Sequence, residues 1–78
     1  MRIYPNPASG VINIEFSGTE RPEQITLFAS DGRKVADYFA KASETNVQLR
    51  IPEPAEGIYL LRILMKDGKV VTRKIVSK

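Results

Sequence analysis

The stretch IYLLRILMKDGKVVTRKIV, residues 58–76, joins two apolar segments through the dipeptide Asp67-Gly68. Asp-Gly is typical of tight β-hairpins, because both central residues of such a turn can take a positive φ. Residues 58–66 are apolar on both faces, which predicts a central strand that is covered on both sides. Residues 70–76 are expected to form its antiparallel partner, so the whole stretch predicts a β fold.

Three other segments alternate apolar and polar residues with the period of two that is typical of a half-buried strand. In VINIEF, residues 11–16, the positions Ile12, Ile14 and Phe16 share one predicted inner face. Segments 24–29 and 46–51 repeat this alternation. Their predicted inward positions are Ile25, Leu27, Ala29, Val47, Leu49 and Ile51.

Segment 33–42 is compatible with two structures. A second Asp-Gly dipeptide, Asp31-Gly32, leads into it from segment 24–29, which favours a strand in a second hairpin. The alternative is an amphipathic helix, because four apolar residues have the spacing i, i+3, i+4, i+7. These residues are Val35, Tyr38, Phe39 and Ala42.

The composition agrees with a single small β domain. The chain has 78 residues, of which 42% are apolar and 27% charged, as in a soluble globular domain. Fourteen residues are Ile or Val and five are Leu, which favours pleated sheets over helix bundles. Short apolar segments separated by Gly and Pro predict a sandwich or barrel of six or seven strands.

The residue types exclude most catalytic and metal-binding chemistry. Without Cys and His the chain has no disulfide, thiolate nucleophile, Cys/His zinc site or imidazole base. The pairs Glu20/Glu23 and Glu53/Glu56 lie in Pro-containing polar stretches, which we interpret as solvated loop charge. No calcium loop, phosphate cradle or nucleophile elbow is present. We therefore expect no enzyme activity, no metal and no cofactor.

The basic residues gather at the C-terminal end. The formal net charge is +3, and residues 66–78 contain five Lys or Arg against Asp67 alone. Charge on a final edge strand discourages aggregation and is one sufficient explanation. Nucleic-acid binding is not predicted, because no aromatic residue is interleaved with these cations for base stacking. Aromatic residues elsewhere in the chain, most of them at predicted core positions, include Tyr4, Phe28, Tyr38, Phe39 and Tyr59.

The sequence contains no membrane or leader segment of the usual kinds. The longest apolar run, Ile58 to Met65, is eight residues long and is interrupted by Arg62, so membrane insertion is not predicted. The opening residues MRIYPNPASG lack the apolar region of a secretory signal. If the protein is exported, an upstream segment is expected to carry the export signal.

Three motifs together resemble a known family. YPNPASG at 4–10, GIYLL at 57–61 and RKIVSK at 73–78, with an Asp-Gly turn between the first two, look like the type IX secretion system C-terminal sorting domain, type A. The resemblance covers about Ile3 to Lys78. It implies a small immunoglobulin-like antiparallel β-sandwich that ends proteins secreted by Bacteroidota and acts as an address rather than a catalyst.

The resemblance also implies partners and site residues. The passenger would be fused at the N-terminal side, cross the periplasm, and reach the cell surface or medium through an outer-membrane translocon, with sortase-like components that remove the domain. Residues 1–78 would then be a single domain at the end of a larger secreted protein. The opening motif falls on Tyr4, Pro5, Asn6, Pro7 and Gly10, the Gly-x-Tyr element on Gly57 and Tyr59, and the terminal element on Lys74, Ile75, Val76 and Lys78, with Ser77 departing from many members.

Residues 70–76 suggest how such a domain could be recognised. The segment alternates poorly, so we expect a loosely fixed register and an edge open to strand addition by a translocon component. Lys74 and Lys78 would steer association. The competing interpretation makes Ile75 and Val76 plain core, with Gly57 as a positive-φ hinge and Tyr59 as a core side chain.

A second class of function is also open. The chain could be a generic immunoglobulin-like or fibronectin-like accessory domain of a secreted enzyme, serving as a spacer or a glycan binder. Glycan binding usually needs several exposed aromatic side chains on one polar face, and the sequence does not place three of them together.

Overall fold

The chain forms seven strands and no helix in the residues that the computed structural model describes, which are 1–4, 10–51 and 56–77. The all-β prediction is confirmed, and segment 33–42 contains a strand, so the helical alternative is wrong. The pattern did not predict the short first strand. The strands are β1 (Arg2–Tyr4), β2 (Val11–Glu15), β3 (Pro22–Ala29), β4 (Lys34–Phe39), β5 (Asn46–Arg50), β6 (Gly57–Met65) and β7 (Val70–Ser77).

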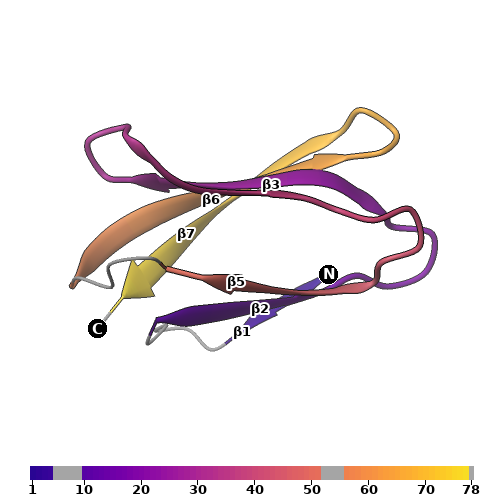
Figure 1. The fold of residues 1–78 in the computed structure, drawn as a ribbon, viewed down its shortest axis with the longest axis horizontal. Helices are drawn as coiled ribbons and strands as arrows, with labels where there is room; N and C mark the ends of the chain where they lie inside the picture. The colour runs from indigo at the N-terminus through magenta and orange to yellow at the C-terminus, as the bar shows by residue number, and fades with distance from the viewer. Residues whose placement is uncertain (5–9, 52–55, 78) are drawn as a thin grey trace.

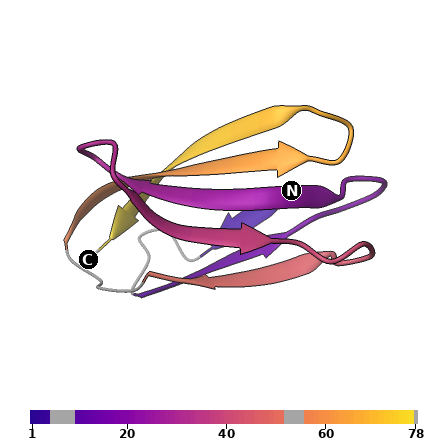
Figure 2. The ribbon, with the colours of Figure 1, turned by 45° about the horizontal axis from the view of Figure 1, so that its top comes forward.

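The strands build two antiparallel sheets that face each other as the layers of a sandwich (Figure 1). One sheet has the order β1-β2-β5 and the other the order β4-β3-β6-β7. Figure 2 shows β4 and β7 at opposite edges of the larger sheet. The predicted edge position of the last strand is therefore confirmed, and β6 is a central strand with a partner on each side.

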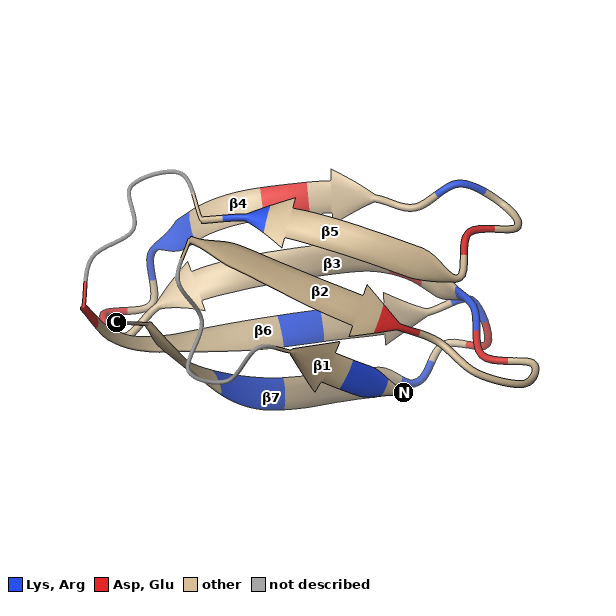
Figure 3. Cartoon of the chain, turned by 90° about the horizontal axis from the view of Figure 1, so that it is seen from below, with Lys and Arg blue, Asp and Glu red and all other residues tan. Residues whose placement is uncertain are grey.

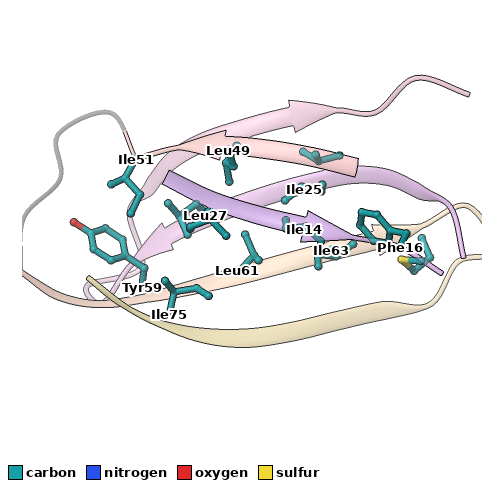
Figure 4. Packing of buried hydrophobic residues seen from close by; sticks show 13 residues of the cluster. Ile14, Phe16, Ile25, Leu27, Leu49, Ile51, Tyr59, Leu61, Ile63 and Ile75 are labelled. Carbon is teal, nitrogen blue, oxygen red and sulfur yellow. The ribbon is translucent and has the colours of Figure 1, made fainter. Parts of the chain in front are cut away.

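The core fills the space between the two layers (Figure 4). The inward positions predicted from the alternation are confirmed: Ala29 is partly buried against the core, and the other predicted residues are buried. The side chains of β6 that face the core complete the layer. The buried apolar residues are Ile12, Ile14, Phe16, Ile25, Leu27, Val47, Leu49, Ile51, Tyr59, Leu61, Ile63, Met65 and Ile75.

Both Asp-Gly hairpins form, but the predicted turn geometry is wrong. Gly32 and Gly68 have φ values of 88° and 92°, whereas no described non-glycine residue has a positive φ. Gly68 N donates to Met65 O at 2.9 Å, and Met65 N donates to Lys69 O at 2.8 Å. This is a three-residue loop with glycine in the left-handed position, and the β3–β4 turn repeats it.

The central strand β6 is not covered on both sides. Its inner face is buried, but Ile58 is 47% exposed, Leu60 is 43% exposed and Arg62 is also exposed on the other face. The prediction was wrong because apolar residues on both faces of a strand do not show that the same chain supplies a second covering layer.

The aromatic side chains also differ from the prediction. Of the five that were expected to be mostly core, only Tyr59 is buried, and Phe39 is 70% exposed at the end of β4. Tyr38 is half-buried and packs against the core, as expected, whereas Phe28 and Tyr4 are half-buried outside the core cluster. The expectation is therefore wrong for Phe28, Tyr4 and Phe39.

The register of β7 is continuous. Eight consecutive residue pairs join it to β6, from Gly57 opposite Ser77 to Leu64 opposite Val70, without a shift. The structure therefore gives β7 one uninterrupted register with β6, and the expectation of a loosely fixed register stays a prediction. The continuous register follows from the tight hairpin and from the burial of Ile75 in the core, because a shift by one residue would move Ile75 to the outer face of the sheet.

Candidate functional site

Two of the three predicted motifs, the Gly-x-Tyr element and the terminal element, lie side by side where β6 begins and β7 ends. The start of β6 pairs with the end of β7, so that Gly57 lies opposite Ser77, Tyr59 opposite Ile75 and Leu60 opposite Lys74. Residues separated by 14 to 20 positions in the sequence thus form one cluster. Figure 4 shows Tyr59 and Ile75 near the same end of the core.

Successive residues of β7 have different surroundings. Ile75 is 1% exposed and belongs to the core, while Val76 is half-buried and Lys74 is exposed. The core interpretation therefore holds for Ile75, and Lys74 remains available to a partner. Lys78 lies outside the described residues.

Gly57 and Tyr59 have clear roles in the fold. Gly57 has a φ of 148°, a backbone conformation that L-residues with a side chain rarely adopt, and it is the first residue of β6. Tyr59 is buried at 8% exposure. Residues 52–55, with Pro52 and Pro54, lie outside the described residues. Gly57 therefore has the positive φ that was expected, and Tyr59 is a core side chain.

The backbone of β7 has an unpaired edge with a defined composition. Met65 and Lys69 form a hydrogen-bonded pair, and such pairs alternate with non-hydrogen-bonded pairs along an antiparallel ladder. Every second residue of β7 therefore directs its N–H and C=O away from β6. These residues are Val70, Thr72, Lys74 and Val76.

A hollow of about 210 Å³ lies beside this edge, between the two sheets. Its lining combines apolar and cationic side chains, and in Figure 3, seen from below, β1 overlaps β7. A strand added to β7 would direct alternate side chains toward this hollow, since side chains alternate across a sheet. The lining residues are Met1, Ile3, Arg73, Lys74 and Ile75.

The opening motif is not assembled with the terminal motif. Tyr4 donates its hydroxyl hydrogen bond to Glu15 Oε2 at 3.0 Å, and its ring lies 4.3 Å from the Arg2 guanidinium carbon. Gly10 has a φ of 89° and its carbonyl accepts a hydrogen bond from Ile51 N at 2.9 Å. Pro5, Asn6 and Pro7 lie outside the described residues.

The C-terminal cations fall into two groups. Lys66 pairs with Glu23 at 2.9 Å and Lys69 lies 3.9 Å from Asp67, so these two are partly neutralised near the β6–β7 turn. Arg73 and Lys74, in contrast, form no ion pair with the described residues. The unpaired positive charge of β7 therefore lies near the middle of the strand.

The carboxylates are held in surface hydrogen bonds. The pKa of Asp37 is lowered, first by the hydrogen bond from Gln24 and then by those from Thr26 and Lys34. The pKa of Glu20 is lowered, mainly because Ser17 N donates to it at 3.0 Å. A lowered pKa keeps a carboxylate ionised and unsuited to general acid catalysis at neutral pH.

The described ranges meet neither the requirements of a metal cluster nor those of a membrane-spanning helix. They contain no group of three acidic side chains placed to hold a metal ion. They also contain no helix with the length and apolar character needed to span a membrane. The pair Glu20/Glu23 was predicted to lie in a loop, and this is wrong for Glu23, which lies within β3.

Comparison with known families decides the assignment. The family described as "Secretion system C-terminal sorting domain" matches residues 2–78. The chain belongs to the type IX sorting domains. The family is non-catalytic in general, and membership supports a sorting-signal role, interaction with the type IX secretion machinery, and export across the outer membrane. No curated protein sequence matches the chain.

A solved structure is also similar to this sorting domain. The crystal structure of CopC from Methylosinus trichosporium OB3b matches with a TM-score of 0.56 and 27% sequence identity. The match covers 91% of this chain and 76% of that chain. The likeness supports the β-sandwich architecture.

Proposed function

We propose that this sorting domain ends a larger secreted protein and directs a covalently fused N-terminal passenger through the outer-membrane translocon of the type IX system. The passenger then reaches the cell surface or the medium. The observation that carries this proposal is the family match over residues 2–78. The domain acts as an address, and sortase-like components of the system act on it after transport.

Recognition uses the free edge of β7. Four residues of this strand direct their backbone groups away from β6, so an extended segment of a translocon component can add as a further strand. Backbone hydrogen bonds supply most of the affinity in this mode, and side-chain pockets supply specificity. The hollow beside Ile75 and Arg73 is placed to receive alternate side chains of the added strand.

The cations of β7 act mainly on the rate of association. Lys74 is exposed and has no ion pair in the described part of the chain, and we assign the same role to Lys78. Exposed charges contribute only about 0–1 kcal/mol each to binding or stability. Their larger effect is to steer the encounter with an acidic partner, and this effect falls as salt is raised.

A reporter fusion tests the proposed function. Residues 1–78 are fused behind a reporter that carries a signal peptide, and the fusion is expressed in a host with a functional type IX system. We expect the reporter outside the outer membrane, whereas the same reporter without residues 1–78 stays in the periplasm. If both reporters stay in the periplasm while the host exports its own cargo, the proposal is wrong.

A further inference from the structure

The outer face of the four-stranded sheet carries all four large apolar side chains that are strongly exposed in the described residues. Phe39 is 70%, Val70 56%, Ile58 47% and Leu60 43% exposed. Half-buried neighbours extend this surface, which we name the outer apolar face. It consists of Phe28, Phe39, Ile58, Leu60, Leu64, Val70 and Val76.

The strand register makes these side chains neighbours. Leu60 of β6 lies opposite Phe28 of β3 on one side, and Ile58 lies opposite Val76 of β7 on the other. Leu64 lies opposite Val70 in the same way. Cross-strand partners project from the same side of a sheet. Six of the seven residues therefore form apolar pairs on one surface, and Phe39 lies on the same surface opposite Gln24.

A shallow hollow lies within this surface. It has a volume of about 250 Å³ and combines the side chains of Leu64 and Val70 with polar groups of Gln24, Thr26 and Arg62. Clustered exposed apolar side chains rimmed by polar groups are typical of protein interaction sites, whereas single exposed apolar residues are normal. The outer apolar face is thus a candidate binding surface.

The charge on this face is positive and partly unpaired. Arg62 projects between the apolar clusters, with its guanidinium carbon 5.2 Å from the centre of the Phe28 ring. Neither Arg62 nor Lys74 forms an ion pair with the described residues. The carboxylate of Asp37 is already engaged, because it accepts hydrogen bonds from Gln24 at 2.9 Å and Thr26 at 3.0 Å and pairs with Lys34 at 3.4 Å.

We propose that the outer apolar face binds a protein partner whose contact surface presents apolar side chains bordered by carboxylates. The apolar residues of the partner cover Leu60, Leu64 and Val70, and its carboxylates pair with Arg62 and Lys74. Aromatic residues and Arg are enriched at the energetic centres of protein interfaces, and Phe28 and Arg62 lie together on this face. The face uses side chains whereas the β7 edge uses backbone groups, although Val70, Lys74 and Val76 contribute to both. The inference rests on the proposed function in that the partner is sought in a type IX host.

The charge of the outer apolar face argues against two other binding partners, a second copy of the chain and an anionic lipid surface. A second copy of the chain stacked on this face would bring its own Arg62 and Lys74 toward the same cations, and like charges that meet across an interface are unfavourable. Binding to anionic lipid usually needs a cluster of about four to eight Lys or Arg. This face offers Lys34, Arg62 and Lys74, and Lys34 is paired with Asp37.

Site-directed photocrosslinking tests the inference in cells. A photoreactive phenylalanine derivative replaces Leu60 in the reporter fusion, and a matched fusion carries it in place of Gln48, which is exposed on β5 in the other sheet. We expect the probe at position 60 to yield a single crosslinked peptide, identified by mass spectrometry, that contains apolar and acidic residues. A lipid adduct, a crosslink to a second copy of the chain, equal products at both positions, or no product at position 60 would overturn the inference.

Charge reversal tests the chemistry of the partner. Arg62→Glu should lower the crosslink yield at position 60 by about tenfold, which corresponds to about 1.4 kcal/mol. Arg62→Lys should keep most of the yield, and Arg50→Glu, on β5, should leave it unchanged. The thermal unfolding midpoint of each variant is measured, and Arg62→Gln provides a second, milder change if Arg62→Glu impairs folding. Undiminished yield in a folded variant that lacks the positive charge of Arg62 contradicts the assigned charge complementarity.

The same cells separate failure of this inference from failure of the proposed function. If the unmodified fusion is exported and position 60 gives no specific crosslink, only the outer apolar face is wrongly assigned. If the unmodified fusion is not exported, the proposed function is wrong, and the product at position 60 still decides whether this face binds an apolar and acidic protein surface.

Discussion

The two outer faces of the sandwich differ although both belong to sheets that cover the same core. On the three-stranded sheet, polar side chains satisfy one another: Tyr4 donates to Glu15 at 3.0 Å, Arg2 pairs with Glu15 at 3.4 Å, and Gln48 donates to Asn13 at 3.2 Å. On the four-stranded sheet, apolar side chains are exposed and Arg62 has no acidic partner in the described ranges.

The difference shows that the alternation of apolar and polar residues reports on the inner face of a sheet and does not determine its outer face. Burial selects apolar residues on the inner face of every strand, because each sheet covers the shared core. The outer face is under no such requirement. An outer face that is polar and internally paired needs no partner, whereas one that keeps Ile58, Leu60 and Val70 exposed retains apolar area that binding would remove from water.

Two adjacent residues of β6 provide the largest predicted contrast. Leu61 is fully buried, and Leu61→Ala should lower the free energy of unfolding by about 2–5 kcal/mol. Leu60 is 43% exposed, and Leu60→Ala should change it by less than about 1 kcal/mol. Urea unfolding of both variants measures the contrast. Equal losses would mean that the outer apolar face is part of the folding core.

The start of β6 gives the next largest effect. Gly57 has a φ of 148°, so Gly57→Ala should lower the free energy of unfolding by about 1–3 kcal/mol through backbone strain. The exposed neighbour Glu56 provides the control, and Glu56→Ala should stay within about 0.5 kcal/mol of the parent. A neutral Gly57→Ala in thermal or urea unfolding would show that the strand can begin without the glycine conformation.

The paired polar face should respond weakly to loss of its charge. Glu15→Gln removes the ion pair with Arg2 while keeping an acceptor for Tyr4, so the loss of stability should be about 0.2–1 kcal/mol. The loss should shrink in high salt, because exposed pairs are screened. Comparing urea unfolding in low and high salt checks both statements, and a loss that is large and independent of salt would contradict them.

The smallest effect concerns acid stability on the other face. The pKa of Asp37 is lowered in the folded state, chiefly by the hydrogen bond from Gln24. The contribution of Asp37 to the free energy of unfolding is therefore present above the unfolded-state pKa of about 3.9, and it is lost as pH falls through the folded-state pKa. Asp37→Asn should therefore weaken the pH dependence of unfolding as pH falls below about 5. An unchanged pH profile of urea unfolding would show that Asp37 does not contribute to it.

The alternating pattern predicted much of the fold because core burial repeats every second residue. Ile12, Ile14, Val47 and Leu49 are buried as the period of two requires. The three-residue strand β1 is too short for such a pattern to be visible. The turn type was missed because Asp-Gly fits both a two-residue turn and the observed loop, in which only Gly68 has a positive φ.

Part of the candidate site was predictable from the sequence. The Asp67-Gly68 hairpin and the family motifs pointed to Lys74 and the last strand, and the structure places that strand at a sheet edge. The outer apolar face was misread, because Leu60 and Leu64 have the same apolar character whether a covering layer belongs to the chain or to a partner. Only the spatial arrangement distinguishes these cases.

Recognition through the β7 edge is tested most directly by two substitutions at one residue. In the reporter fusion, Lys74→Ala removes the charge, while Lys74→Pro also removes an N–H that points to the free edge and is not used by β6. With unfolding midpoints checked for both, we predict that Lys74→Ala is still exported at a modestly lower rate and that folded Lys74→Pro stays in the periplasm. Normal export of folded Lys74→Pro would contradict strand addition at this edge.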